Sequence, residues 1–193
     1  MHKLAISGKM RAGKNTVASL IVEKMQYPTD KIKIVGLADP MKYMVKTMFP
    51  EANSDYLFGP SELRSQPIAE KYLDANGNVL THRQALLDLG AFGRKYNNDI
   101  WLNCLVADTK VAKDIYLYIV SDCRFINEFN YLKKAGFVMI RVRRNCETTA
   151  NDISETEQDA ILDSEFDFII ENNGSLTALN NKVREVVVEL LIR

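Results

Sequence analysis

The sequence predicts an α/β fold in which a five-stranded parallel sheet carries helices on both faces. Apolar runs of strand length alternate with segments of helical period along the chain. The most strand-like run, at 115–120, is apolar throughout, which is typical of a central strand covered on both faces. A glycine loop and a helix follow the first strand, at 4–6. This pattern indicates strands joined by right-handed helical crossovers.

The first half of the chain supplies two strands and two helices of this pattern. Apolar positions after Thr16 predict a helix, and 32–37 is the second strand. Pro40 opens the next helix, since the missing N–H of a proline has no intrahelical partner in a first turn. Pro50 ends that helix.

The segment 51–81 breaks the regular alternation. Gly59-Pro60, Pro67 and Asn76-Gly77-Asn78 predict short helices and a hairpin at Asn76-Gly77. Helices are expected next at 82–96 and at 100–111, the second of them capped by Asp99.

The last part of the chain returns to alternating strands and helices. The elements expected there are strand 115–120, helix 125–134, strand 137–142, a polar segment at 145–164, strand 166–170, a turn at 172–174 and a helix from Ser175, its cap, to Leu191.

Composition limits the class of protein. The 193 residues fit one α/β domain, with or without small insertions. Because 25 basic residues balance 25 acidic ones, a nucleic-acid partner is not expected. No apolar run has the length of a membrane span and no signal peptide is recognised, so we expect a cytoplasmic protein without a membrane partner.

Cysteine and histidine chemistry is not expected to carry the function. Cys104, Cys123 and Cys146 are far apart and lack metal-ligand spacing, so reduced thiols are expected. With only His2 and His82, a histidine metal site or a Ser-His-Asp triad is disfavoured.

The loop between the first strand and helix predicts phosphate binding. Gly8 is followed after four residues by Gly13-Lys14, between a strand and a helix. Backbone N–H groups and the helix N-terminus would bind one anion, and Lys14 adds a full charge. Asn15 stands where this motif has Ser or Thr, and the hydroxyl follows at Thr16. The alternative is a glycine turn with an incidental lysine.

The end of the strongest strand predicts a second functional group. Asp122 is placed to bind Mg²⁺ or its water shell, and Arg124 can contact a phosphate or Asp122 itself. The alternative is a helix N-cap followed by a surface arginine.

Basic residues follow the next strand. Arg141 and Arg143 face one way if that strand continues, and Arg144 follows them. The functional interpretation is a lid that brings guanidinium groups onto transferring phosphates. The alternative is a solvated strand end.

Residues in the middle of the chain suggest a second substrate. Arg83 and Arg94 could hold another anion, and Trp101 could stack on a base, although a single Trp on a helix more often packs. Asp39 is either a helix N-cap or a substrate contact. The polar groups expected at the carboxyl edge of the sheet are Gly8, Asp39, Asp122, Arg144 and Asn172.

Taken in order, several motifs resemble those of phage deoxynucleoside monophosphate kinases. The resemblance covers most of the chain outside 51–80. It rests on Ser7 to Thr16, Leu-Ala-Asp-Pro-Met-Lys at 37–42, Arg83 with Leu89-Gly90, Asp122-Cys-Arg124, Arg144, Thr156-Glu157 and Asn-Asn-Gly-Ser-Leu at 172–176.

The resemblance implies a P-loop kinase that uses ATP and Mg²⁺ to convert a deoxynucleoside monophosphate to the diphosphate. A single domain spans 1–193, with a core at 1–50 and 112–193, a helical acceptor-binding insertion at 51–111 and a lid at 143–165. Catalytic residues would be Lys14, Asp122, Arg124 and Arg144. ATP would bind Gly8, Arg11, Ala12, Gly13, Lys14, Asn15, Thr16, Asn172 and Gly174. The acceptor would bind Asp39, Lys42, Arg83, Arg94, Trp101 and Arg124, and the metal Asn15 and Asp122.

Some alternatives stay open. Asn15 replaces an acidic residue of the family pattern and the middle section is shorter, which leaves the accepted base undecided. Other acceptors, such as dephospho-coenzyme A, phosphomevalonate or a nucleic-acid 5′ end, and a non-catalytic nucleotide-binding protein are the competing hypotheses. A homodimer is among the assemblies that the sequence allows, and a viral protein would act in the host cytoplasm.

Overall fold

The computed structural model describes residues 1–145 and 153–192. Of the polar segment and lid expected around 143–165, residues 146–152 lie outside the described residues, and so does Cys146. Within the described ranges no helix is long and apolar enough to cross a membrane.

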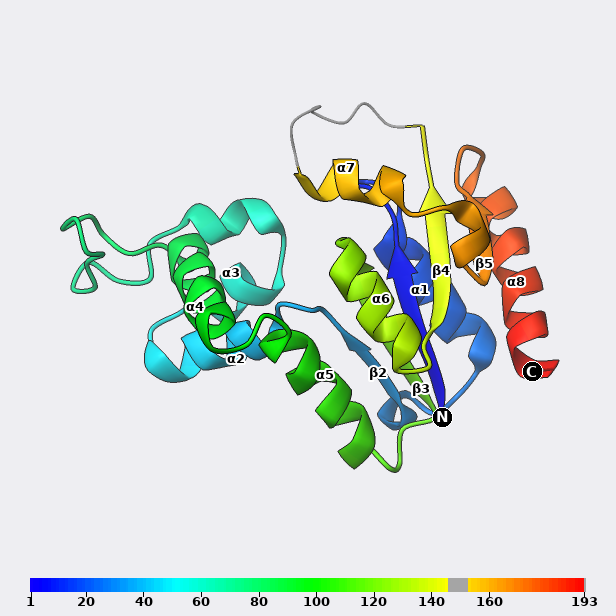
Figure 1. Cartoon of the computed structure of the whole chain (residues 1–193), viewed down its shortest axis with the longest axis horizontal. Coiled ribbons are helices and arrows are strands. Elements are labelled where there is room, and N and C mark those ends of the chain that lie inside the picture. The colour runs from blue at the N-terminus through cyan, green and yellow to red at the C-terminus, as the bar shows by residue number, and fades with distance from the viewer. Residues whose placement is uncertain (146–152, 193) are drawn as a thin grey trace. The chain divides into compact units, whose positions relative to one another are not determined.

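The sheet has five parallel strands, as the sequence predicts (Figure 1). Their order across the sheet is β2-β3-β1-β4-β5. They are β1 (His2–Ser7), β2 (Ile32–Val35), β3 (Leu117–Cys123), β4 (Val138–Arg143) and β5 (Phe168–Glu171).

Eight α-helices are described, and the expected ones lie within a few residues of their predicted bounds. They are α1 (Lys14–Met25), α2 (Asp39–Met48), α3 (Ser54–Phe58), α4 (His82–Tyr96), α5 (Ile100–Val111), α6 (Ile126–Lys134), α7 (Ile153–Ala160) and α8 (Leu176–Ile192). The Ser175 hydroxyl accepts the N–H of Ala178 at 3.2 Å and confirms the predicted cap of α8. The polar segment contains one helix, α7.

The chain forms two compact units, residues 1–37 with 108–193 and residues 38–107. The second unit therefore begins at Ala38, earlier than the boundary near residue 50 expected from the sequence. It has its own core, which includes Val45 of α2, Leu57 of α3 and Ala85 of α4. The hairpin predicted at Asn76-Gly77 is present, with an antiparallel bridge between Leu73 and Val79.

In the first unit, α1 and α8 cover one face of the sheet (Figure 1). Leu4 and Ile6 of β1 pack with Ile21 of α1 and Val183 of α8. Side chains alternate along a strand, so residues between these positions point to the other face. Helix α6 lies on that opposite face (Figure 1), and its Phe129 ring contacts Phe166 at a centroid distance of 4.8 Å.

Strand register places three loops side by side at the carboxyl edge. Ser7, the last residue of β1, aligns with Cys123 of β3 and with Arg141 of β4. From Ala5 to Ser7 the partner strand advances from Val120 to Cys123, so β3 carries a bulge of one residue there. A bulge re-aims the side chain beside it, and this one lies at Ser121-Asp122.

Candidate functional site

The loop from Gly8 to Gly13 joins the central strand β1 to α1, and close packing requires its two glycines. A Cβ on Gly8 would lie 2.4 Å from the carbonyl oxygen of Val142. Gly13 has φ +99°, and its Cβ would lie 2.4 Å from Nδ2 of Asn172. Arg11 also has a positive φ, 62°. The loop is thus tightly turned, and it packs directly against Val142 and Asn172.

Lys14 places a charge inside this loop. Its side chain is buried, with 8% exposed, and Nζ donates to the carbonyls of Gly8 at 2.6 Å and Lys9 at 2.9 Å. Helix α1 begins at Lys14 without a side-chain cap and without an acidic residue in its first turn. A helix N-terminus of this kind attracts anions, since its first N–H groups carry partial positive charge.

Asn172 braces the loop from the turn between β5 and α8. Its Nδ2 donates to the carbonyl of Ala12 at 2.9 Å, and its backbone N–H donates to the carbonyl of Arg143 at 2.7 Å. The structure therefore brings Asn172 against the loop, and the ATP contacts expected of Asn172 and Gly174 stay a prediction.

Asp122 lies at the bulge at the end of β3. Its Oδ1 accepts the backbone N–H of Leu37 at 2.8 Å, which ties the carboxylate to the chain after β2. The carboxylate is half-buried beside the strand that leads into the loop.

Arg124 leaves the sheet at the start of α6. Oε2 of Glu128 accepts the backbone N–H groups of Arg124 at 2.8 Å and Phe125 at 3.0 Å. Burial, together with the smaller effect of the nearby Asp122 charge, raises the pKa of Glu128 to about 7 despite these two bonds. Burial likewise raises the pKa of the Cys123 thiol well above its usual value, so this thiol is protonated and unreactive.

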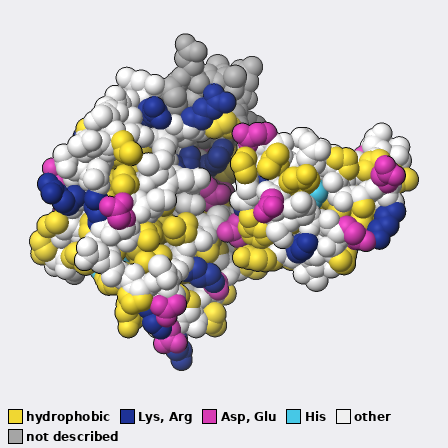
Figure 2. Space-filling model, turned by 180° about the vertical axis from the view of Figure 1, so that it is seen from behind, with side chains coloured by type: hydrophobic (Ala, Val, Ile, Leu, Met, Phe, Trp, Pro, Cys, Tyr) yellow, Lys and Arg dark blue, Asp and Glu magenta, His cyan; other side chains and the backbone are white. Residues whose placement is uncertain are grey.

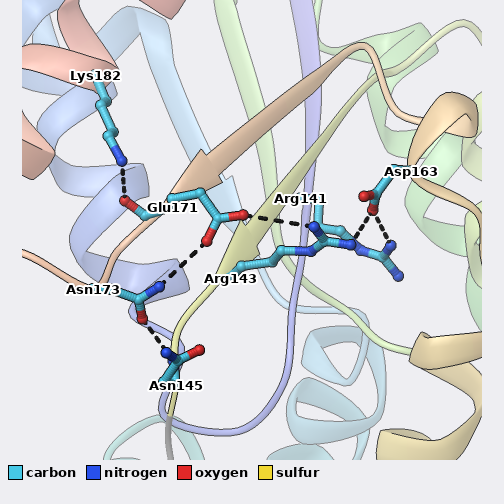
Figure 3. Close-up of polar contacts among 7 residues, drawn as sticks. All are labelled: Arg141, Arg143, Asn145, Asp163, Glu171, Asn173 and Lys182. Atoms are coloured by element: carbon cyan, nitrogen blue, oxygen red, sulfur yellow. Dashed lines mark hydrogen bonds and ion pairs between the residues drawn. The ribbon is translucent and has the colours of Figure 1, made fainter.

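The arginines at the end of β4 share one acidic partner (Figure 3). Oδ1 of Asp163 accepts from Nη1 of Arg141 at 2.6 Å and from Nη2 of Arg143 at 2.5 Å. The bond from Arg141 lowers the pKa of Asp163, and Arg143 adds to the effect. Figure 3 also shows Glu171, whose Oε1 lies 3.6 Å from Nη1 of Arg143. Arg141 and Arg143 therefore face one way, as predicted.

A cavity of about 390 Å³ opens between the loop and these arginines. Its lining includes Gly8, Lys9, Arg143, Arg144, Asn145 and Glu171. Arg144 is exposed at this edge. The cavity thus has cationic groups from β4 on one side and the start of the glycine loop on the other.

The residues predicted to bind the acceptor at 38–107 belong to the second unit. Asp39 follows the N-cap residue, Ala38, and its Oδ1 pairs with Nζ of Lys42 at 2.6 Å. Nη2 of Arg83 donates to the carbonyl of Ser61 at 2.8 Å. Arg83 and Arg94 are exposed near opposite ends of α4, roughly 16 Å apart along its axis. They therefore share a helix face rather than one compact anion site.

Trp101 is packed inside the second unit. It is 8% exposed, and its Nε1 donates to the carbonyl of Gly90 at 3.3 Å. A Cβ on Gly93 would lie 2.4 Å from the indole ring. The structure favours the packing alternative for Trp101 over a platform for a base.

Two residues of the first unit were missed by the sequence analysis. Glu128 lies three residues after Phe125, the spacing of a helix N-terminal capping box, and that signal could have found it. Gln158 of α7 is buried and hydrogen-bonded to Ser7 and to the chain at Cys123-Arg124. Its partners are 34 to 151 residues away, so no local pattern predicts it.

Charged side chains and possible metal ligands can be compared with the loop site. On the face that Figure 2 displays, Lys and Arg side chains are interspersed with acidic and apolar ones. Across the described part of the chain, no group of three or more His, Cys, Asp or Glu side chains is arranged to hold a metal. The oxygen donors expected for the metal are the Asn15 amide, in the first turn of α1, and the Asp122 carboxylate, at the bulge of β3. This hard-oxygen set fits Mg²⁺, which takes few protein ligands.

A sequence model of the deoxynucleotide monophosphate kinase family matches residues 61–183. The chain belongs to this family. It is a nucleotide kinase, a phosphotransferase, as the resemblance implies. The match begins after the loop at 8–16, so the geometry of that loop is independent support for nucleotide binding in this kinase.

Solved structures show the same fold. The dephospho-CoA kinase from Campylobacter jejuni is similar, with a TM-score of 0.52 and 13% identity over 97% of this chain and 96% of that one. At this identity the likeness shows the P-loop kinase fold alone. No curated protein matches the chain.

Proposed function

We propose that this kinase transfers the γ-phosphoryl group of ATP to a deoxynucleoside monophosphate, forming a deoxynucleoside diphosphate and ADP. The observation that carries the proposal is the burial of Lys14 inside a glycine loop at the carboxyl edge of the sheet. The family match over 61–183 supports the acceptor class. The resemblance to phage enzymes supports a role in deoxynucleotide metabolism in a host cytoplasm.

On the donor side, ATP phosphates bind the backbone N–H groups from Gly8 to Thr16, including the loop positions Arg11 and Ala12, and the N-terminus of α1. Nζ of Lys14, now on two loop carbonyls, exchanges them for phosphate oxygens with little movement. The Asn172 turn, including Gly174, holds the loop in shape and borders the adenine. Asp122 and Asn15 would hold Mg²⁺, which neutralises phosphate charge when bound, and the Thr16 hydroxyl would donate to a phosphate oxygen.

The transfer step depends on position and charge rather than on a protein nucleophile. Arg124 extends from a turn whose backbone is fixed by Glu128, so its guanidinium can meet the charge that develops on the transferring group. Arg144, which lines the cavity just after the end of β4, acts on the same group. Exclusion of water from the phosphates on substrate binding would favour transfer over ATP hydrolysis.

On the acceptor side, the second unit binds the monophosphate. Arg83 and Arg94 are exposed cations of this unit, and the buried Lys42 pairs with the half-buried Asp39, which can order polar groups nearby. Because the two arginines stand at opposite ends of α4, we assign only one of them, Arg83, to the acceptor phosphate.

The test is a phosphoryl-transfer assay with ATP, Mg²⁺ and the four deoxynucleoside monophosphates. We expect ADP formation that depends on at least one of them. Dephospho-coenzyme A and phosphomevalonate serve as the alternative acceptors. Turnover with one of these and no deoxynucleotide contradicts the acceptor class, and ATP binding without turnover contradicts catalysis.

The variant Lys14→Ala tests the loop. Loss of the buried charge should lower kcat/KM by at least about 10³-fold, since it removes both phosphate binding and charge stabilisation. Lys31→Ala is the matched control, because Lys31 precedes β2 at the opposite edge of the sheet. Equal activity of the two variants would refute the role of the loop.

A further inference from the structure

The end of α7 contacts three parts of the nucleotide-binding edge through consecutive residues. Oε2 of Glu157 accepts the N–H of Ile126 at 3.0 Å, and Oδ2 of Asp159 pairs with Nζ of Lys9 at 2.8 Å. Between them, Gln158 reaches inward. Figure 1 shows α7 at the carboxyl ends of β1 and β4.

Gln158 is a buried amide with every hydrogen-bonding group of its side chain in use. It is 2% exposed. Oε1 accepts from the Ser7 hydroxyl at 3.0 Å, and Nε2 donates to the carbonyls of Cys123 and Arg124, each at 3.0 Å. Carbonyl oxygens only accept, so Nε2 must face them, and the orientation of the amide is determined by its partners.

These partners belong to the two segments that the proposed transfer reaction must hold together. Ser7 directly precedes Gly8, where the loop begins. The Cys123 and Arg124 carbonyls belong to the turn that carries the Arg124 side chain. Arg141 of β4 donates to the backbone carbonyl of Gln158 and adds a third strand to the network.

The hydrogen bond from Gln158 to the Arg124 carbonyl restrains the backbone that carries the Arg124 side chain. The Arg124 backbone N–H is held by Glu128 and its carbonyl by Gln158, so both sides of the residue are restrained. Without the amide, the buried carbonyls of Cys123 and Arg124 lose a donor and the turn must shift to satisfy them. A displacement of about 1 Å at a reacting group can lower the rate about 10²-fold.

We propose that Gln158 is a positioning residue of the phosphoryl-transfer site, which sets the Arg124 turn relative to the start of the phosphate loop. This inference rests on the proposed function for its kinetic consequence. It assigns no contact with substrate to Gln158. Its action passes through the backbone of Arg124 and the hydroxyl of Ser7.

The experiment compares Gln158→Met and Gln158→Glu with the core variant Val187→Ala. Methionine keeps the volume and glutamate keeps the shape, while both lack the two Nε2 donors. Val187 is buried in α8 and contacts none of the network residues by hydrogen bond, so its variant controls for loss of stability. We expect kcat to fall about thirtyfold in both Gln158 variants with the KM for ATP changed less than about threefold. Ser7→Ala, which removes one partner, should cause a smaller fall in kcat.

A second readout does not depend on turnover. The Phe125 amide donates to Glu128 of α6 and the Ile126 amide to Glu157 of α7, next to Gln158, so their hydrogen exchange should accelerate in Gln158→Met and not in Val187→Ala. Equal exchange in the two variants overturns the proposal, as does a kcat that only follows stability. If the wild-type protein phosphorylates no deoxynucleotide, the proposed function fails, and the exchange rates alone still decide the role of Gln158.

Discussion

Two pairs of cationic residues, Lys14 and Arg141 in one unit of this kinase and Arg83 and Arg94 in the other, are held differently. In the unit that contains the sheet, Lys14 and Arg141 are buried and donate to backbone carbonyls. In the unit at 38–107, Arg83 and Arg94 are exposed, and Arg83 is tethered by one bond to Ser61. A group held by several bonds is already oriented, whereas an exposed arginine loses conformational freedom when it binds. Substitutions should therefore act mainly on kcat in the first unit and on KM in the second.

The largest effect is expected at Arg124. Arg124→Ala should lower kcat about 10³-fold, because a guanidinium that meets transition-state charge is lost while ATP binding remains. Steady-state kinetics with both substrates varied will measure it. Arg184→Ala, an exposed arginine of α8, is the control. A change in the KM for ATP with kcat intact would assign Arg124 to binding and weaken the contrast between the units.

The buried Glu128 predicts a pH dependence of stability. Its pKa in the folded state is about 7, against 4.5 for the ordinary carboxyl. Between these values the folded state holds a proton that the unfolded state has released, so stability falls as pH rises. The whole difference corresponds to roughly 3 kcal/mol.

The variant Glu128→Gln removes this titration. Urea unfolding of both proteins between pH 4.5 and 8 measures it, and the variant should gain stability relative to the wild type as pH rises. If the difference in unfolding free energy between the two proteins stays constant with pH, Glu128 does not titrate in this window. Burial in the first unit would then not raise the pKa of this carboxyl.

A smaller effect is expected at Arg83. Arg83→Ala should raise the KM for the deoxynucleoside monophosphate about tenfold and leave the KM for ATP unchanged, since one exposed charge-assisted contact is lost. Lys95→Ala, an exposed cation on the same helix, is the matched control. A large loss of kcat instead would place Arg83 with the restrained residues of the first unit.

The smallest effect is expected at Trp101. Trp101→Phe should lower the unfolding free energy by about 1 kcal/mol through loss of the bond to Gly90, and should not change either KM. Thermal unfolding and kinetics together test it. A several-fold rise in the KM of the acceptor, with stability unchanged, would support stacking on a base.

Local signals predicted most of the fold and part of the site. Gly8, Gly13 and Lys14 lie between an apolar strand and a helix, and the spacing of this motif determines its structure over a few residues. The cap at Ser175 and the turn at Asn76-Gly77 were predictable for the same reason. Trp101 was ambiguous, because burial against Gly90 and Gly93 depends on how two helices pack.

Other features have no local signal. The bulge in β3 that orients Asp122 arises from pairing with β1, more than 100 residues away in the chain. The shared partner Asp163 pairs with Arg141 and Arg143 only after β4 and the segment before β5 are packed together. The sequence analysis could find the arginines but not the carboxylate that they share.

By itself, the sequence determined the order of strands and helices, the phosphate loop and the acidic and basic groups that follow the strands. These depend on periodicity, glycine placement and the parallel direction of the strands, which act over short stretches of chain. Only the tertiary structure decided which side chains are restrained. Burial of Lys14, Glu128 and Gln158 requires partners from distant elements, and those partners set their hydrogen bonds and, for Glu128, the pKa.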